Sequence, residues 1–153
     1  VQGALSNQSH VRFELFNVEE REKESEKVNN VGYNLKGGFS IETGANSNIF
    51  FNTGFYQRQP FHDNIYLNFT NFVNPLTSNE DITSIEMGYS YSTRDFTANI
   101  NAYSTLWENR VVTSSRIVND VVQLTTNQGV GQRHNGIELD FKARLFNDNL
   151  TLA

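Results

Sequence analysis

The chain has 153 residues, of which 37% are hydrophobic, with no cysteine and a formal net charge of −5. The absence of cysteine excludes a disulfide framework and thiolate metal sites. The negative charge argues against a nucleic-acid surface, because no basic stripe is available to neutralise phosphates. No stretch reaches the roughly 18 to 20 continuous apolar residues that a transmembrane helix needs. The 12 Phe and 6 Tyr nevertheless favour strands with one polar and one apolar face.

A run of mixed charge, EEREKESEK, occupies residues 19–27. Its spacing allows a helical turn in which Glu19 and Lys23 attract each other. We interpret the run as a solvated external loop, with contact to cations or lipopolysaccharide as the alternative.

The first clear strand pattern lies in residues 31–42, VGYNLKGGFSIE. The odd positions are mainly apolar and the even positions are Gly, Asn, Lys, Ser or Glu. A period of two predicts a strand with one apolar and one polar face. A short turn near residues 43–46 leads into a second predicted strand at about 48–57, and a long irregular loop is expected over residues 59–80.

The same alternation continues through the second half of the chain. Strands are predicted over residues 82–91 and 96–106, joined by a short turn, and over residues 133–146, with a second long loop over 108–132 before the last of them. A turn at 147–149 leads to a final LTLA. The polar face of the 133–146 strand carries Glu, Asp, Lys and Arg, and four charges on one strand face cannot lie in a dry core. One face of the sheet must therefore be wet.

Short turns at one end, long loops at the other and two unlike strand faces predict the fold class. We expect an all-β, antiparallel, up-and-down transmembrane β-barrel segment of about six to eight strands, too few to close alone. Ten-residue strands tilted near 45° span roughly 23 Å of hydrocarbon. Aromatic residues on the apolar face nearest the short turns are expected to form an interfacial girdle: Phe39, Phe51, Tyr89, Tyr91, Phe96 and Phe141. The alternative is a soluble β-sandwich with these aromatic residues in its core.

The spacing of several short motifs resembles that of the TonB-dependent outer-membrane receptors. The matching residues are Gly54-Phe55-Tyr56, Arg58-Gln59-Pro60, Asn74-Pro75, Glu80 and Glu86-Met87-Gly88-Tyr89. FTANINAYSTLWENR and GIELDFKARLFNDNLTL resemble later strands of the same family. Asn79-Glu80, in place of the commoner Pro-Glu, is most similar to receptors of Bacteroidetes-type bacteria. The resemblance covers most of the chain from about residue 31 onward.

This resemblance implies a location and a set of partners. A receptor of this family lies in the outer membrane of a Gram-negative bacterium and imports a scarce nutrient such as an iron chelate, a cobalamin-like cofactor or an oligosaccharide. Its expected partners are the membrane lipid, its own plug domain and remaining barrel strands, and an inner-membrane energy-coupling protein that acts through the plug. We expect residues 1–153 to be a partial barrel domain, without the plug and the final barrel strand. A passive channel or adhesin barrel and a soluble carbohydrate-binding module are the alternatives.

Candidate ligand-binding residues lie in and beside the long loops, where a barrel presents its vestibule. They combine aromatic rings that stack on a sugar or chelate with cations that pair with an anion: Arg58, His62, Asp63, Asn64, Tyr66, Trp107 and Arg110. The alternative is that these side chains pack the loops against one another. His10, His62 and His134 lie far apart in the sequence without ligand spacing, so no metal site or cofactor is expected. No nucleophile stands beside a His and an acid, so enzymatic activity is not expected.

Overall fold

The computed structural model describes residues 1–14, 16, 19, 22–66, 70–118, 121–145 and 150–152. Seven strands and one short helix make up the regular structure. The strands are β1 (Gln2–His10), β2 (Val28–Gly44), β3 (Ser47–Arg58), β4 (Glu80–Ser92), β5 (Phe96–Val118), β6 (Val121–Leu145) and β7 (Leu150–Leu152), and the helix is α1 (His62–Ile65).

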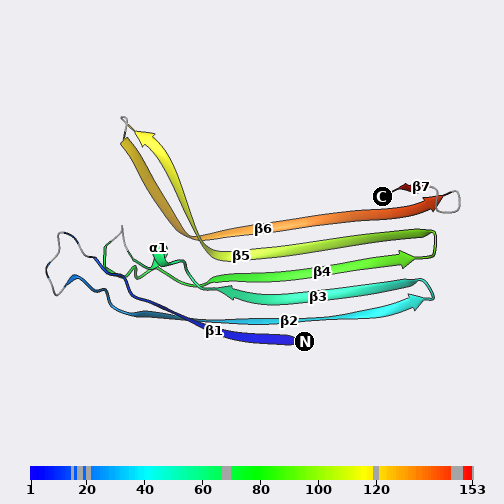
Figure 1. The fold of residues 1–153 in the computed structure, drawn as a ribbon, viewed down its shortest axis with the longest axis horizontal. Helices are drawn as coiled ribbons and strands as arrows, with labels where there is room; N and C mark the ends of the chain where they lie inside the picture. The colour runs from blue at the N-terminus through cyan, green and yellow to red at the C-terminus, as the bar shows by residue number, and fades with distance from the viewer. Residues whose placement is uncertain are drawn as a thin grey trace.

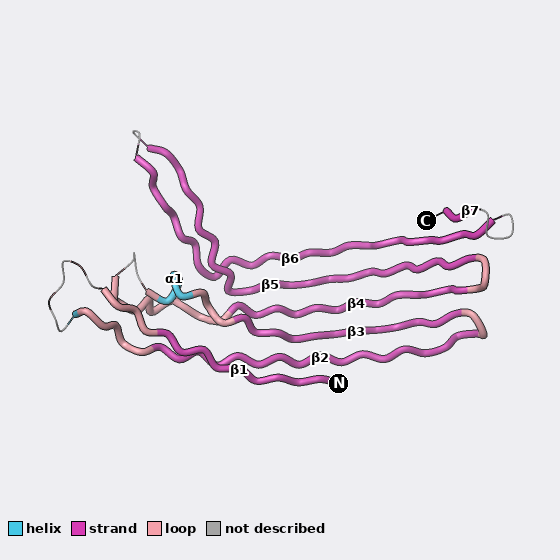
Figure 2. The backbone as a smooth tube through the Cα atoms, viewed as in Figure 1, coloured by secondary structure: helices cyan, strands magenta, loops and turns pink. Residues whose placement is uncertain are grey.

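The strands form one antiparallel sheet in which each strand pairs with its neighbours in the chain, in the order β1-β2-β3-β4-β5-β6-β7. Figure 1 shows an open sheet, with β1 at one edge and β7 at the other. The short β2–β3 and β4–β5 connections lie at one end, and α1 and the longer connections lie at the opposite end (Figure 2). The predicted all-β, up-and-down antiparallel fold is confirmed.

The register aligns the apolar positions of neighbouring strands on one side of the sheet. Phe51 pairs with Met87, and Ile100 pairs with both Tyr89 and Leu139. We call this side the apolar face; on β4 it consists of Ile85, Met87, Tyr89 and Tyr91, all of them exposed. The expected aromatic girdle lies on the same face near the short turns. The predicted alternation is therefore confirmed across the sheet.

The opposite side, the polar face, carries Ser84, Glu86, Gly88 and Ser90 on β4 and the residues that pair with them. Its side chains bond across the strands: the Asn52 amide donates to Glu86 (3.1 Å), and the hydroxyls of Ser84 and Thr105 lie 3.1 Å apart. These hydrogen bonds pair polar side chains of neighbouring strands with one another.

Aromatic rings on the polar face lie close to glycines of neighbouring strands. A Cβ built on Gly136 would lie 2.5 Å from the Tyr103 ring, and one on Gly88 would lie 2.5 Å from the Phe50 ring. Glycine is required where a ring approaches the backbone this closely. Each ring covers the backbone of a glycine that has no side chain of its own. This contact favours one register between the two neighbouring strands.

The prediction of a second long loop over residues 108–132 is wrong. β5 and β6 continue through this region as a paired hairpin, with register shifts between Trp107 and Arg110 and between Arg110 and Val112. Asn109 there has a left-handed φ of 58°. The hairpin bends away from the rest of the sheet in Figure 1. The region is rich in Val and Thr, which favour strands even where apolar and polar residues do not alternate.

Three other sequence expectations concern the connections between strands. The described residues of the charged run 19–27 lie in the connection between β1 and β2, where Glu22 N–H donates to the Glu19 carbonyl (2.9 Å) in a single turn. The predicted turn at 147–149 lies outside the described residues. The loop over residues 59–80 is confirmed as a long connection and holds α1.

Burial is concentrated in this long connection and not in the sheet. Among the described residues, the buried hydrophobic side chains are Ile65 and Tyr66, at 0% and 3% exposure. In contrast, Leu139 on the apolar face is 73% exposed. In the part of the chain that is described, the strands form a single layer and no helix is long and apolar enough to cross a membrane.

Candidate functional site

The loop end of the polar face is closed by an ion pair between two strands. Arg58 ends β3 and pairs in register with Glu80, the first residue of β4. The Arg58 guanidinium lies 2.7 Å from the Glu80 carboxylate, which is 7% exposed, whereas the Arg58 side chain is 41% exposed. Arg58 stabilises the buried Glu80 carboxylate. Its own side chain remains partly exposed, so part of its positive charge is accessible to solvent.

Aromatic rings surround this guanidinium. The Arg58 Cζ lies 4.9 Å from the centroid of the Phe61 ring and 5.8 Å from that of Trp107. The Arg110 Cζ lies 5.0 Å from the Trp107 centroid. Cation–π contacts of this kind contribute about 0.5–1 kcal/mol each at exposed sites. We call Arg58, Phe61, Trp107 and Arg110 the arginine–tryptophan cluster.

The strand register places Arg58 and Trp107 of this cluster on the polar face. Trp107 pairs with Ile82 on β4 and with Gln132 on β6, and Ile82 shares the parity of Ser84. Arg110 donates a hydrogen bond to the Gln132 side-chain oxygen. Its Nε is buried and has no hydrogen-bond partner among the described residues. A guanidinium beside a tryptophan ring suits an anionic or planar ligand.

Asn64 and Tyr66 hold the long connection together. The Tyr66 hydroxyl donates to the Glu26 carbonyl (3.1 Å), and the Asn64 carbonyl accepts from Asn74 Nδ2 (3.1 Å) and from the Thr77 hydroxyl (2.5 Å). Asn74 N–H also donates to the Ile65 carbonyl (2.7 Å). The Tyr66 side chain thus links the long connection to the β1–β2 connection, whereas Asn64 takes part through its backbone carbonyl.

His62 lies beside His10, although the two residues are 52 positions apart in the chain. Their Nδ1 atoms are 3.3 Å apart, their ring centroids are 5.5 Å apart, and the Tyr66 ring lies 5.1 Å from that of His62. Desolvation, followed by the charge of His62, lowers the pKa of His10 below its ordinary 6.5. Antiparallel pairing brings the end of β1 to α1, which places the two rings side by side although they are far apart in the sequence.

Asp63 is exposed and lines a small hollow with Arg12, His62 and Tyr66. The Arg12 guanidinium is already engaged, by Glu14 (3.1 Å) and by the Asn71 side-chain oxygen (2.9 Å). The seven predicted site residues thus lie at one end of the sheet in two groups, the arginine–tryptophan cluster and the α1 region. In the described part of the chain, no three His, Asp or Glu side chains gather as metal ligands.

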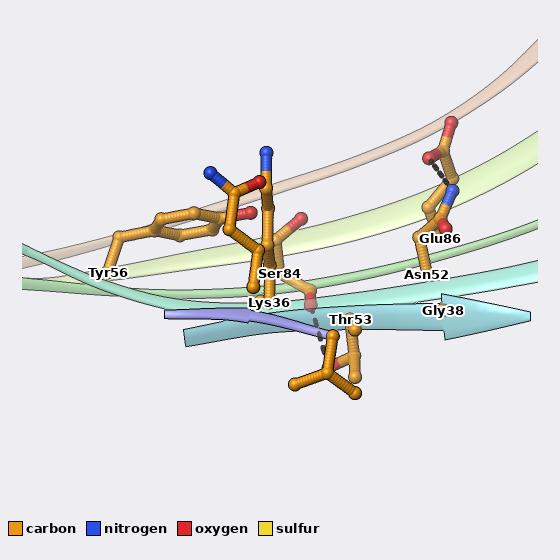
Figure 3. A pocket seen from close by; sticks show the side chains of 11 residues that line it. Lys36, Gly38, Asn52, Thr53, Tyr56, Ser84 and Glu86 are labelled. Carbon is orange, nitrogen blue, oxygen red and sulfur yellow. Dashed lines mark hydrogen bonds between the residues drawn. The ribbon is translucent and has the colours of Figure 1, made fainter. Parts of the chain in front are cut away.

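The sequence did not indicate a larger hollow further along the sheet, shown in Figure 3. It has a volume of about 600 Å³ and is lined mainly by polar-face residues, among them Lys36, Asn52, Tyr56 and Glu86. Gly38, Gly54 and Ser84 also line it. Side chains of neighbouring residues approach two of these positions closely, Asn52 at Gly38 and Tyr56 at Gly54.

A single open layer of up-and-down strands, with one apolar and one polar face, defines a segment of a β-barrel wall. A solved structure with a similar fold is that of the copper transporter OprC, with a TM-score of 0.61 and 14% identity. The similarity covers 80% of this chain and 19% of that chain, so this chain spans about a fifth of that protein. At this identity the similarity concerns the fold. No model of a known protein family matches the sequence, and no curated protein matches it either.

Proposed function

We propose that this chain forms part of the wall of a TonB-dependent transporter in the outer membrane of a Gram-negative bacterium. The observation that carries the proposal is the apolar face. Large apolar residues are exposed on neighbouring strands from β2 to β6, including Phe39, Ile49, Met87, Ile100 and Leu139. Soluble monomers rarely expose apolar patches larger than a few hundred Å², whereas lipid is the solvent that such a face requires.

The dimensions of the apolar face support a bilayer location. On β2 this face runs from Val31 to Ile41, which corresponds to roughly 33 Å along the strand and roughly 23 Å across a membrane at a 45° tilt. Tyr89, Tyr91 and Phe96 lie at the end near the short turns, where aromatic rings favour the membrane interface. The fold shared with the copper transporter OprC also supports a transporter barrel.

The arginine–tryptophan cluster is the proposed contact for the imported ligand. Its residues Arg58 and Trp107 lie on the polar face at the loop end, and the cluster offers a tryptophan ring and two guanidinium groups. These groups suit a small anionic chelate or an oligosaccharide with acidic or planar groups. Import then proceeds through a plug domain driven by an inner-membrane energy-coupling protein, as the resemblance to this receptor family implies. We propose no enzymatic activity for the chain.

Adjacent positions on β5 test the membrane location. In the full-length protein, Ile100→Lys places a charge on the apolar face and Asn99→Lys places the same charge on the polar face. Ile100→Lys is expected to prevent assembly in the outer membrane, whereas Asn99→Lys assembles as the wild type does. Assembly is measured by fractionation and by the heat-dependent mobility of the folded barrel on gels. Equal tolerance of the two substitutions contradicts the proposal.

Energy coupling is tested separately. Uptake of the nutrient that supports growth is compared in cells with and without the inner-membrane energy-coupling protein, with the full-length protein present in both. Loss of uptake in the cells that lack the coupling protein is the expected result. Unchanged uptake assigns the barrel to a passive channel.

A further inference from the structure

We propose that His10 and His62 form a binding site for a divalent transition-metal ion such as Zn²⁺. Their Nδ1 atoms lie 3.3 Å apart although the residues are 52 positions apart in the chain. Two imidazole nitrogens bound to one tetrahedral Zn²⁺ at about 2.0–2.1 Å lie roughly 3.3 Å from each other. The observed separation therefore matches two ligands of a shared ion.

The tautomer that frees the His10 lone pair has a partner in the structure. A metal on Nδ1 requires the ring proton on Nε2, and Nε2 of His10 lies 3.4 Å from the Gln8 side-chain oxygen. Gln8 and His10 are two positions apart on β1, so their side chains lie on the same face. Metal-binding histidines commonly donate their second N–H to an oxygen in this way, which fixes the ring orientation.

His62 is held from a different direction. It begins α1, and its ring packs against that of Tyr66, 5.1 Å away. Tyr66 is 3% exposed and is anchored by its hydrogen bond to the Glu26 carbonyl. Each imidazole is therefore positioned by its own neighbours, Gln8 for His10 and Tyr66 for His62. This preorganisation reduces the loss of side-chain entropy on binding.

The charged groups that line the hollow beside His62 are one cation and one carboxylate. Arg12, the cation that lines the hollow beside His62, is engaged by Glu14 and Asn71. Asp63 lines the same hollow and is exposed, so a carboxylate stands on the solvent side. Two protein ligands leave the other coordination positions for water or for groups that the metal carries. Such an open site suits an exchangeable ion, and imidazole ligands suit Zn²⁺, Cu²⁺ and Ni²⁺.

The experiment measures Zn²⁺ binding to the full-length protein by calorimetry, with the salt of the metal alone as the probe. Hydrogen exchange of the segments around residues 8–12 and 61–66 reports on the same samples, because it locates the ion. Zn²⁺ is expected to slow exchange in both segments. In His10→Gln and His62→Gln the affinity is expected to fall at least about tenfold and the protection to disappear, while His134→Gln, on β6, behaves as the wild type does.

A substitution that keeps a metal ligand separates binding from a structural effect. His62→Cys retains a side chain that coordinates Zn²⁺ as the thiolate, so Zn²⁺-dependent protection of both segments is expected to return relative to His62→Gln. Unchanged Zn²⁺ affinity and protection in His10→Gln and His62→Gln would show that the two rings share only a hydrogen bond. Absence of Zn²⁺-dependent protection in the wild type overturns the proposal as well. The inference does not depend on the membrane location or on transport.

Discussion

Ile100 on β5 pairs in register with Leu139 on β6, and the next pair along the two strands is Asn99 with Asp140. The Asn99 amide donates to the Asp140 carboxylate (2.9 Å), whereas Leu139 is 73% exposed. Adjacent residue pairs thus present opposite chemistry to opposite sides of one layer. A sheet only one layer thick needs a different solvent on each side to satisfy both faces.

The first prediction concerns the free energy of folding in lipid. Leu139→Lys in the full-length protein is expected to lower the stability of the barrel by roughly 2 to 4 kcal/mol, the cost of lysine near the bilayer midplane. Asp140→Lys is expected to have a smaller effect, because that position faces the polar side. Denaturant unfolding in lipid vesicles measures both values. Similar losses in the two variants would contradict the assignment of the faces.

The second prediction concerns the ion pair at the loop end. Arg58→Ala leaves the Glu80 carboxylate, 7% exposed, without its cation. The expected loss of stability is roughly 1 to 3 kcal/mol, since a buried charge loses its partner. The double variant Arg58→Ala with Glu80→Gln is expected to recover part of this loss, because the neutral amide needs no counter-charge.

A matched control for this pair lies at the opposite end of the sheet. Arg94 and Asp95 are 3.9 Å apart, with side chains 85% and 69% exposed. Arg94→Ala is expected to change the unfolding free energy little, because surface ion pairs contribute close to zero. If Arg58→Ala lowers the unfolding free energy no more than Arg94→Ala does, burial of Glu80 does not increase the contribution of the ion pair to stability.

The third prediction concerns close backbone approach on the polar face. A Cβ on Gly38 would lie 2.6 Å from the Phe51 carbonyl oxygen, an atom that cannot move without the strand. Gly38→Ala is therefore expected to destabilise the sheet by roughly 1 to 3 kcal/mol. Gly131→Ala is the control, because its Cβ would meet only the Trp107 carbonyl oxygen at 3.9 Å. Thermal unfolding compares the midpoints of the two variants. Equal midpoints would show that the strand shifts to accommodate a Cβ at Gly38 without loss of stability.

The fourth prediction concerns pH in the absence of added metal. The pKa of His10 lies below 6.5, first through desolvation and second through His62. As the pH falls below about 6.5, the unfolded chain takes up this proton before the folded chain does, so the His10 contribution to stability is lost at lower pH. His62→Gln is expected to raise the pKa of His10 only part of the way, because desolvation remains. NMR titration of labelled histidine measures the pKa of His10 in both proteins. If His62→Gln does not raise this pKa at all, the lowering is assigned to desolvation alone.

Several features were predictable from single residues and their spacing. The two faces of β2, β4 and β6 follow from alternation in the sequence, and the short turns follow from the polar residues between strands. The hairpin formed by the far halves of β5 and β6 was missed, because Val and Thr there do not alternate with polar residues and the strands are stabilised by pairing with each other. The seven strands lie within the expected range of about six to eight, although β1 lacks a strong alternation in the sequence.

The sequence by itself determined that the strands have two unlike faces, since successive side chains of a strand point to opposite sides whatever the strand pairs with. Only the tertiary structure decided which residues meet across strands, because register and loop path depend on pairing between distant segments. That pairing brings His10 to His62, Arg58 to Glu80 and Trp107, and Tyr103 onto Gly136. None of these contacts has a local signal, because each joins residues that are neighbours in space and remote along the chain.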